Sequence, residues 1–121
     1  DLVNKVKVAA SAKDIEKCGE EIHAVHVEKQ IMGYITDIIQ ASRSHPHVYM
    51  GASPRASLAL LKASKAFACL ANRNFVTPDD VQRACKPVLA HRLILNAGAE
   101  MEGFTSIEVV RNLVEEVEVP R

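Results

Sequence analysis

The strongest constraint on the fold is the start of a long helix at Ser53-Pro54. Serine is a favoured N-cap, because its hydroxyl can accept a hydrogen bond from a free amide of the first turn. Proline suits the first helical position, where no N–H is needed. The Ala- and Leu-rich run that follows, to about residue 71, is apolar over much of its circumference. It therefore predicts a central helix that packs on several sides.

Arg55 is unusual at such a start, because a cation in the first turn faces the positive end of the helix dipole. The N-terminus of a helix is also a natural binding site for anions, especially phosphate. Two interpretations follow from the residues. Arg55 is either a solvated arginine tolerated at a small cost in stability, or part of a site that an anion occupies.

Composition favours packed helices. The chain has 121 residues, the length of one domain with a single core, and its aromatic residues make up only 4% with no Trp, so aliphatic side chains must build that core. No apolar run is long enough to span a bilayer and no signal peptide is visible, so we expect a cytoplasmic protein with no membrane partner. The cysteines lack a CxxC spacing and predict reduced thiols in or near the core, at Cys18, Cys69 and Cys85.

Hydrophobic periodicity and capping signals predict an all-α fold, a small bundle of about five helices with room for short extended pieces. Residues 1–11 should be a linker or N-terminal extension, and residues 12–119 the helical domain. Pro87 should end or kink the fourth helix. The helices are expected at residues 12–22, 28–42, 54–71, 78 to about 87, and 106–117; residues 89–95 suit either a short helix or an extended piece, and residues 96–104 a loop.

Three signals mark the helix ends. Thr77-Pro78-Asp79-Asp80 repeats the start seen at Ser53-Pro54, this time with acidic residues that complement the dipole. Thr105 and Glu108 have the spacing of a capping box. Asn72 is suited to the left-handed conformation that ends many helices. The long central helix should therefore stop just before Asn72.

Few catalytic arrangements fit the sequence. There is no GxxxxGK[S/T] phosphate loop and no strand that ends in paired acids for magnesium, so this chain alone should not hydrolyse ATP. The histidine pairs have no acidic or cysteine partner at metal-ligand spacing, so we expect no metal site. Cys69 and His91 could pair as nucleophile and base, but Cys69 lies on a helical face, where burial is the better interpretation.

Charge is unevenly distributed along a chain whose net charge is zero. Residues 1–42 carry a net charge of −2, residues 43–92 a net +6 and residues 93–121 a net −4. The basic centre includes Arg43, Arg55, Arg73, His91 and Arg92. It could face phosphates, an acidic partner or the acidic ends of the chain itself.

Several motifs, in order and at matching spacings, resemble the C-terminal lid of MoxR-type AAA+ ATPases. The resemblance extends from about residue 25 to 117, over most of the chain. The family usually has Gly-Arg-Asp where this chain has Asn72-Arg73-Asn74. The matching segments are His45-Pro46, Gly51-Ala52-Ser53-Pro54-Arg55-Ala56, Asn72-Arg73-Asn74-Phe75-Val76-Thr77-Pro78-Asp79-Asp80-Val81 and Val88-Leu89-Ala90-His91-Arg92-Leu93.

The resemblance implies an all-helical lid beside a nucleotide that a separate core domain holds, with ATP and Mg²⁺ bound in the parent protein and neither bound by this fragment. It implies that Arg55 is the sensor-2 arginine that reads the γ-phosphate, at a helix start formed by Ser53 and Pro54. The implied partners are the core domain, neighbouring subunits of a ring and a client protein in chaperone-like remodelling, with no nucleic acid. Residues that could line the same phosphate or subunit surface are Arg92, His91, Arg43 and Arg73.

Two alternatives remain open at this point. Phe75-Val76-Thr77-Pro78-Asp79-Asp80-Val81 after a long helix also resembles the end of a histone-fold helix pair, a module that dimerises and binds DNA. The neutral net charge argues against DNA binding, although the basic centre leaves room for it. A helical protein-interaction domain is the other alternative.

Overall fold

The computed structural model describes all of residues 1–121 and is 66% helical. Six α-helices form in the order α1 to α6, with two short 3-10 helices and one two-stranded antiparallel ribbon. The predicted all-α bundle is therefore confirmed. The elements are η1 Leu2–Lys5, α1 Ala12–His23, α2 Lys29–Ser44, β1 Val48–Met50, α3 Pro54–Leu70, α4 Pro78–Leu89, η2 Ala90–Arg92, β2 Ile94–Leu95, α5 Ala97–Met101 and α6 Ser106–Glu116.

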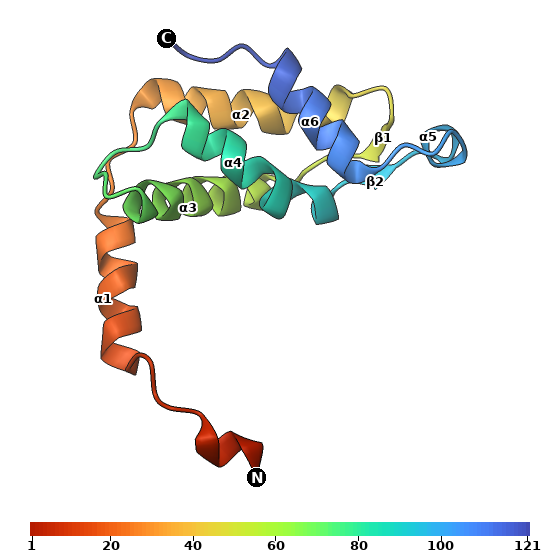
Figure 1. Cartoon of the computed structure of the whole chain (residues 1–121). Helices are drawn as coiled ribbons and strands as arrows, with labels where there is room; N and C mark the ends of the chain where they lie inside the picture. The colour runs from red at the N-terminus through yellow and green to blue at the C-terminus, as the bar shows by residue number, and fades with distance from the viewer.

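The body of the molecule is built from α2, α3, α4 and α6, which pack around one hydrophobic core (Figure 1). The apolar stripe of α2 is buried as predicted, with Ile38 completely covered. Leu60 of α3 and Val81 of α4 are also fully buried, in keeping with the role of α3 as a central helix. Burial of these aliphatic side chains is the main force that holds the four helices together.

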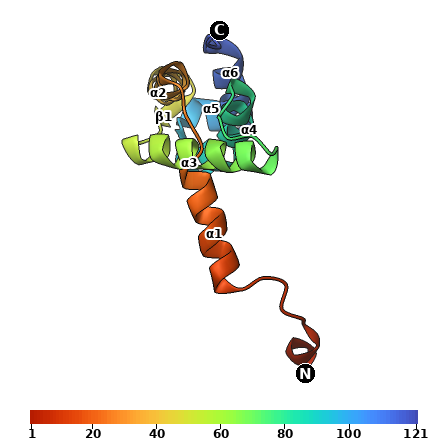
Figure 2. The ribbon, with the colours of Figure 1, turned by 90° about the vertical axis from the view of Figure 1, so that its left-hand side faces the viewer.

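Helix α1 stands apart from this body. In two views at right angles it projects away from the other helices, and the N-terminal segment lies still farther out (Figures 1 and 2). None of its residues is buried, and Ile15 and Cys18 on its apolar face are exposed. Cys18 therefore does not belong in or near the core, contrary to expectation. The assignment of residues 12–119 to one domain stays a prediction.

The loop between α3 and α4 is short and tightly closed. Asn72 has φ of +56°, the left-handed conformation predicted for it. The N–H of Asn72 donates to the carbonyl of Cys69, and the N–H of Arg73 donates to the carbonyl of Ala68. These two bonds form the Schellman arrangement that ends many helices, here with Asn in place of the usual Gly.

Three local expectations were wrong or incomplete. The expectation that Pro87 ends α4 was wrong, because the helix continues to Leu89, whereas a kink at Pro87 stays a prediction. The carbonyl that proline leaves without its helical partner belongs to Arg83, an exposed residue. The expected loop at residues 96–104 contains the short helix α5, capped by the side chain of Asn96. Residues 89–95 contain both a 3-10 turn and a strand, since η2 leads into β2.

Candidate functional site

The start of α3 is held by backbone and neighbouring residues rather than by its own cap. Ser53 occupies the N-cap position and Pro54 the first turn, as expected. The Ser53 hydroxyl makes no capping hydrogen bond, however, which corrects the prediction; the N–H of Ala56 instead donates to the Ser53 carbonyl at 2.9 Å. The exposed hydroxyl of Ser53 is left without a role in the cap.

The segment before α3 is bound to the last turn of α2. The buried Ser42 hydroxyl accepts a hydrogen bond from the N–H of Ala52 at 3.0 Å and donates to the carbonyl of Ile39 at 2.6 Å. The Nε of Arg43 donates to the carbonyl of Ala52 at 2.9 Å. Both polar backbone groups of Ala52 are thus satisfied by neighbouring side chains of α2, which positions the residues that lead to Arg55.

Gly51 allows this close approach. A Cβ at this position would lie 2.6 Å from Cα of Arg43 and 2.7 Å from its backbone N, distances that no side chain can relieve by rotating. Only glycine therefore fits here without a shift of the backbone. The sequence signal was present, because a glycine stands just before the helix start, but its partner Arg43 could not be identified from spacing.

Arg55 follows this fixed segment as an exposed residue in the first turn of α3. Its guanidinium makes no ion pair in the chain, whose ion pairs involve other residues. The first turn of α3 contains no acidic residue to complement the dipole. The geometry therefore presents an unpaired guanidinium beside the positive end of a long helix, on a base that α2 holds in place.

His91 and Arg92 approach the same region through the β-ribbon. Met50 pairs with Ile94, so the end of β1 and the beginning of β2 lie at one end of the ribbon. From this end of the ribbon, β1 continues into α3. At the same end, η2 leads into β2, and η2 contains the exposed residues His91 and Arg92. Arg43 is thus joined to the segment before α3 by its hydrogen bond to Ala52, whereas Arg92 is linked to this region only through the pairing of Ile94 with Met50.

Arg73 belongs to a different place and has a partner of its own. It follows the C-terminal end of α3, whose 17 residues separate it from Arg55 by about 25 Å. Its two terminal nitrogens each donate to an oxygen of Asp80 at 2.7 Å, and one also donates to the carbonyl of Phe75. This bidentate pair orders the loop between α3 and α4. The structure does not bring Arg73 together with Arg55.

Asp80 completes the start of α4 and was not singled out as the partner of Arg73. It is 1% exposed, and its carboxylate also accepts from the N–H and the hydroxyl of Thr77. Burial raises the pKa of Asp80, but the hydrogen bonds from Arg73 and Thr77 outweigh it and hold the pKa below its usual value. Spacing alone could not reveal the pair, because it forms across a turn.

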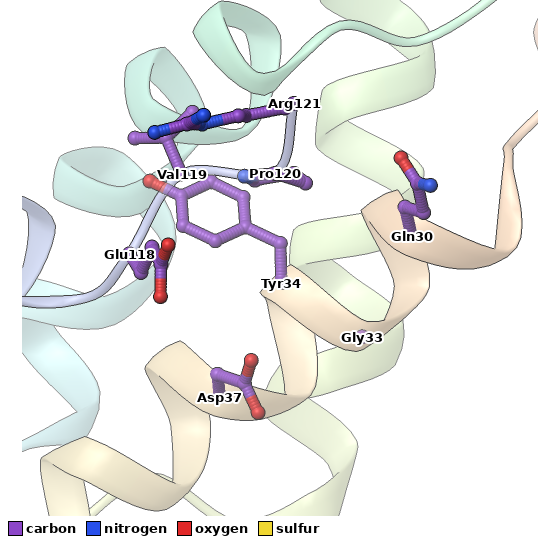
Figure 3. Close-up of a pocket in the computed structure, with 8 residues that line it drawn as sticks. All are labelled: Gln30, Gly33, Tyr34, Asp37, Glu118, Val119, Pro120 and Arg121. Carbon is purple, nitrogen blue, oxygen red and sulfur yellow. The ribbon is translucent and has the colours of Figure 1, made fainter.

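A separate hollow of about 320 Å³ lies between α2 and the C-terminal segment (Figure 3). Tyr34 points from α2 toward that segment, and its hydroxyl accepts a hydrogen bond from Gln82 of α4 at 3.2 Å. Asp37 and Glu118 also line the hollow, and their two carboxylates would repel a phosphate. The hollow is therefore a poor match for an anion and does not include Arg55.

Two findings bear on metals and membranes. No group of three or more His, Cys, Asp and Glu side chains is arranged to hold a metal ion. No helix is long and apolar enough to cross a lipid bilayer.

The class of protein follows from the helical fold and from comparison with known proteins. Residues 40–115 match the family model of the AAA lid domain, and the chain belongs to this family. The resemblance to the C-terminal lid of MoxR-type AAA+ ATPases is thereby confirmed, together with similarity to curated MoxR proteins. The lid assignment replaces the histone-fold alternative.

Among similar proteins, YeaC of Bacillus subtilis is 41% identical over 83% of this chain and 31% of its own length. Chaperone MoxR1 of Mycobacterium tuberculosis is 27% identical over 97% of this chain and 33% of its own. A solved structure from Cytophaga hutchinsonii, described as a "putative ATPase", is 28% identical, with a TM-score of 0.85 over 90% of this chain and 36% of its own. The chain thus spans about a third of the length of these relatives.

Proposed function

We propose that this lid encloses ATP held by a separate core domain and that Arg55 senses the γ-phosphate. The observation that carries the proposal is the unpaired, exposed guanidinium of Arg55 in the first turn of α3, beside the positive end of the helix. An anion placed there would remove the unfavourable interaction between the cation and the helix dipole. Arginine suits the role because it stays charged and can bind two phosphate oxygens at once.

The residues of this chain supply phosphate recognition but not magnesium binding, since no cluster of metal-ligating side chains is present. We therefore assign Mg²⁺ and the hydrolytic groups to the core domain, with this chain inactive by itself. His91 and Arg92 lie in η2, which leads into the end of the ribbon from which the chain continues to α3. They are therefore the next candidates for phosphate or subunit contacts. Arg43 has a positioning role, because its Nε holds the carbonyl of Ala52.

Loss of the γ-phosphate would deprive Arg55 of its anionic partner and allow the lid to move against the core. Such an element has two states whose populations a ligand shifts. We infer that the full-length protein assembles into a ring in the cytoplasm and uses this motion for chaperone-like remodelling of a client. The name of Chaperone MoxR1, a relative, supports this inference.

The test is steady-state ATPase activity of the full-length protein, with ATP affinity and assembly measured alongside. We expect Arg55→Ala to lower ATP turnover by about 10-fold or more, since charge-assisted contacts to phosphate are among the stronger hydrogen bonds. Arg55→Lys should recover part of the loss, because it keeps the charge without the bidentate geometry.

Arg111→Ala is the matched control, because Arg111 is an exposed arginine on α6. It should leave ATP turnover unchanged. Equal turnover in Arg55→Ala and Arg111→Ala, on an assembled protein, would remove Arg55 from the mechanism and leave a helical domain that serves to hold partners.

A further inference from the structure

Two of the three cysteines lie at the junction of α1 and α3. Cys18 of α1 is exposed and Cys69 of α3 is half-buried, and both line one groove of about 310 Å³ between the two helices. The third, Cys85, lies fully buried in α4. The residues of the groove are Cys18, Glu21, Ile22, Ala66, Cys69 and Leu70.

Helix α1 is attached to the body mainly through its C-terminal end. Lys65 of α3 donates from Nζ to the carbonyl of His23, the last residue of α1, at 2.9 Å. The remainder of α1 contributes no buried residue. Cys18 therefore lies on a part of α1 that can approach α3 without disrupting the core.

We propose that Cys18 and Cys69 form a modification site, a reversible disulfide that joins α1 to α3 when the chain meets hydrogen peroxide. The thiolate of one cysteine attacks the O–O bond, takes one oxygen as a sulfenic acid and releases one water after protonation. The second thiolate attacks that sulfur, forms the S–S bond and displaces the hydroxyl, which leaves as a second water. Two thiols thus lose two protons and two electrons, and one peroxide is reduced to two waters.

A disulfide joins Cα atoms about 4.4–6.8 Å apart, and α1, which has no buried residue, can move toward α3 to reach this separation. The two helices already form the walls of one groove, so this movement closes a space that is open in the reduced chain. The bridge would fix the direction in which α1 leaves the body. The bridge would also cover Ile22 of α1, a half-buried residue that lines the same groove.

Cys85 provides an internal control. Burial raises the pKa of its thiol to about 12, so it stays protonated at neutral pH and has no thiolate to react. Oxidation of the folded chain should therefore spare Cys85 and consume the other two thiols together.

The experiment treats the reduced 121-residue chain with hydrogen peroxide and follows intact mass, thiol labelling after unfolding and peptide mapping. We expect a monomer that has lost two hydrogens, a linked peptide pair containing Cys18 and Cys69, and full recovery with a dithiol reductant. Hydrogen exchange of α1 amides should slow several-fold in the oxidised chain. The Cys85→Ala variant, which keeps an apolar side chain at this buried position, should form the same bridge.

The matched variants Cys18→Ser and Cys69→Ser should each abolish the bridge while leaving the fold intact, since neither residue is fully buried. Four results would overturn the proposal: thiols that persist, disulfide dimers through Cys18 with Cys69 still free, masses that rise by oxygen atoms without a bridge, or loss of the Cys85 thiol.

Discussion

The starts of α3 and α4 share a sequence pattern but differ in how they are held. Ser53-Pro54 and Thr77-Pro78 both place a hydroxyl residue at the N-cap and a proline directly after it. At α4, the buried carboxylate of Asp80 binds Thr77 and Arg73, so this buried charge has its partners inside the chain. At α3, an exposed arginine takes the place of the acids. The charges of Asp80 and Arg73 at the α4 start are therefore satisfied within the chain, whereas Arg55 at the α3 start makes no ion pair there.

Under the proposed function, the same local motif would serve stability at α4 and phosphate recognition at α3. The α4 start contributes to folding through its own side chains. The α3 start relies on Ser42 and Arg43 of α2, which fix the backbone of Ala52 and leave Arg55 unengaged. Four measurements test this difference between the two helix starts.

The largest effect is expected at the α4 start. Asp80→Ala should lower the free energy of unfolding by about 3 kcal/mol, because it removes a buried, hydrogen-bonded partner of a cation and the contacts to Thr77. Urea denaturation provides the measurement. The control is Asp79→Ala at the exposed neighbouring position, where a loss below about 1 kcal/mol is expected. Equal losses in the two variants would mean that the buried pair contributes nothing specific.

The next effect tests how α2 supports the α3 start. Gly51→Ala should destabilise the chain by about 1–3 kcal/mol, because the added Cβ would meet backbone atoms of Arg43 at 2.6–2.7 Å. Gly33→Ala is the control of opposite sign. No atom lies within 4 Å of a Cβ there, and alanine favours a helix over glycine by about 1 kcal/mol. A neutral Gly51→Ala would show that the segment before Arg55 is loosely held.

His45, at the end of α2, and Asp80, at the start of α4, should respond to acid in different pH ranges. Burial lowers the pKa of His45, in the segment between α2 and β1, from its usual value of 6.5; His47 lowers it further and Glu116 opposes the change. The unfolded chain therefore binds more protons below about pH 6.5, and stability falls as pH decreases through this range. The lowered pKa of Asp80 acts at lower pH. Its contribution to the free energy of unfolding is present above pH 3.8 and is lost as the pH falls below that value.

Urea denaturation at several pH values measures this separation. His45→Asn should flatten the change between about pH 7.5 and 5.5, because the amide can accept the hydrogen bond from the N–H of His47 without titrating. Asp80→Asn should retain that change and reduce the one near pH 3. A slope near neutrality that survives His45→Asn would assign it to other histidines.

The smallest effect on stability is expected at Arg55. Arg55→Ala should change the free energy of unfolding by no more than about 0.5 kcal/mol, since the side chain is exposed and unpaired. The thermal midpoint of the 121-residue chain is the measurement. A fall of many degrees would make Arg55 a structural residue and remove the contrast between the two starts.

The sequence predicted the helices well where local chemistry decides their ends. Thr77-Pro78 and the Thr105–Glu108 capping box act through neighbours within four residues, so pattern and structure agree. Side chains that act at a distance were not predictable in this way. Arg43 reaches Ala52 across a turn and a strand, and the pairing of Arg73 with Asp80 depends on the left-handed Asn72 that reverses the chain.

Periodicity also reveals a helical face without revealing what covers it. The stripe of α2 is buried in the core, whereas the corresponding face of α1 is open, although both have regular apolar spacing. Helix α5 was missed because Ala97–Met101 is too short for a period to appear. The position of Arg55 at the first turn was predictable, but its freedom from partners required the tertiary structure.

The attachment of α1 by one end has a mechanical consequence. Its 12 residues extend about 18 Å from the junction with α3, so a rotation of about 10° at that junction moves the far end by about 3 Å. A small rotation at the junction of α1 and α3 would thus displace the N-terminal end of α1 by a distance comparable to the length of a hydrogen bond. The direction in which α1 projects is therefore sensitive to small changes at its junction with α3.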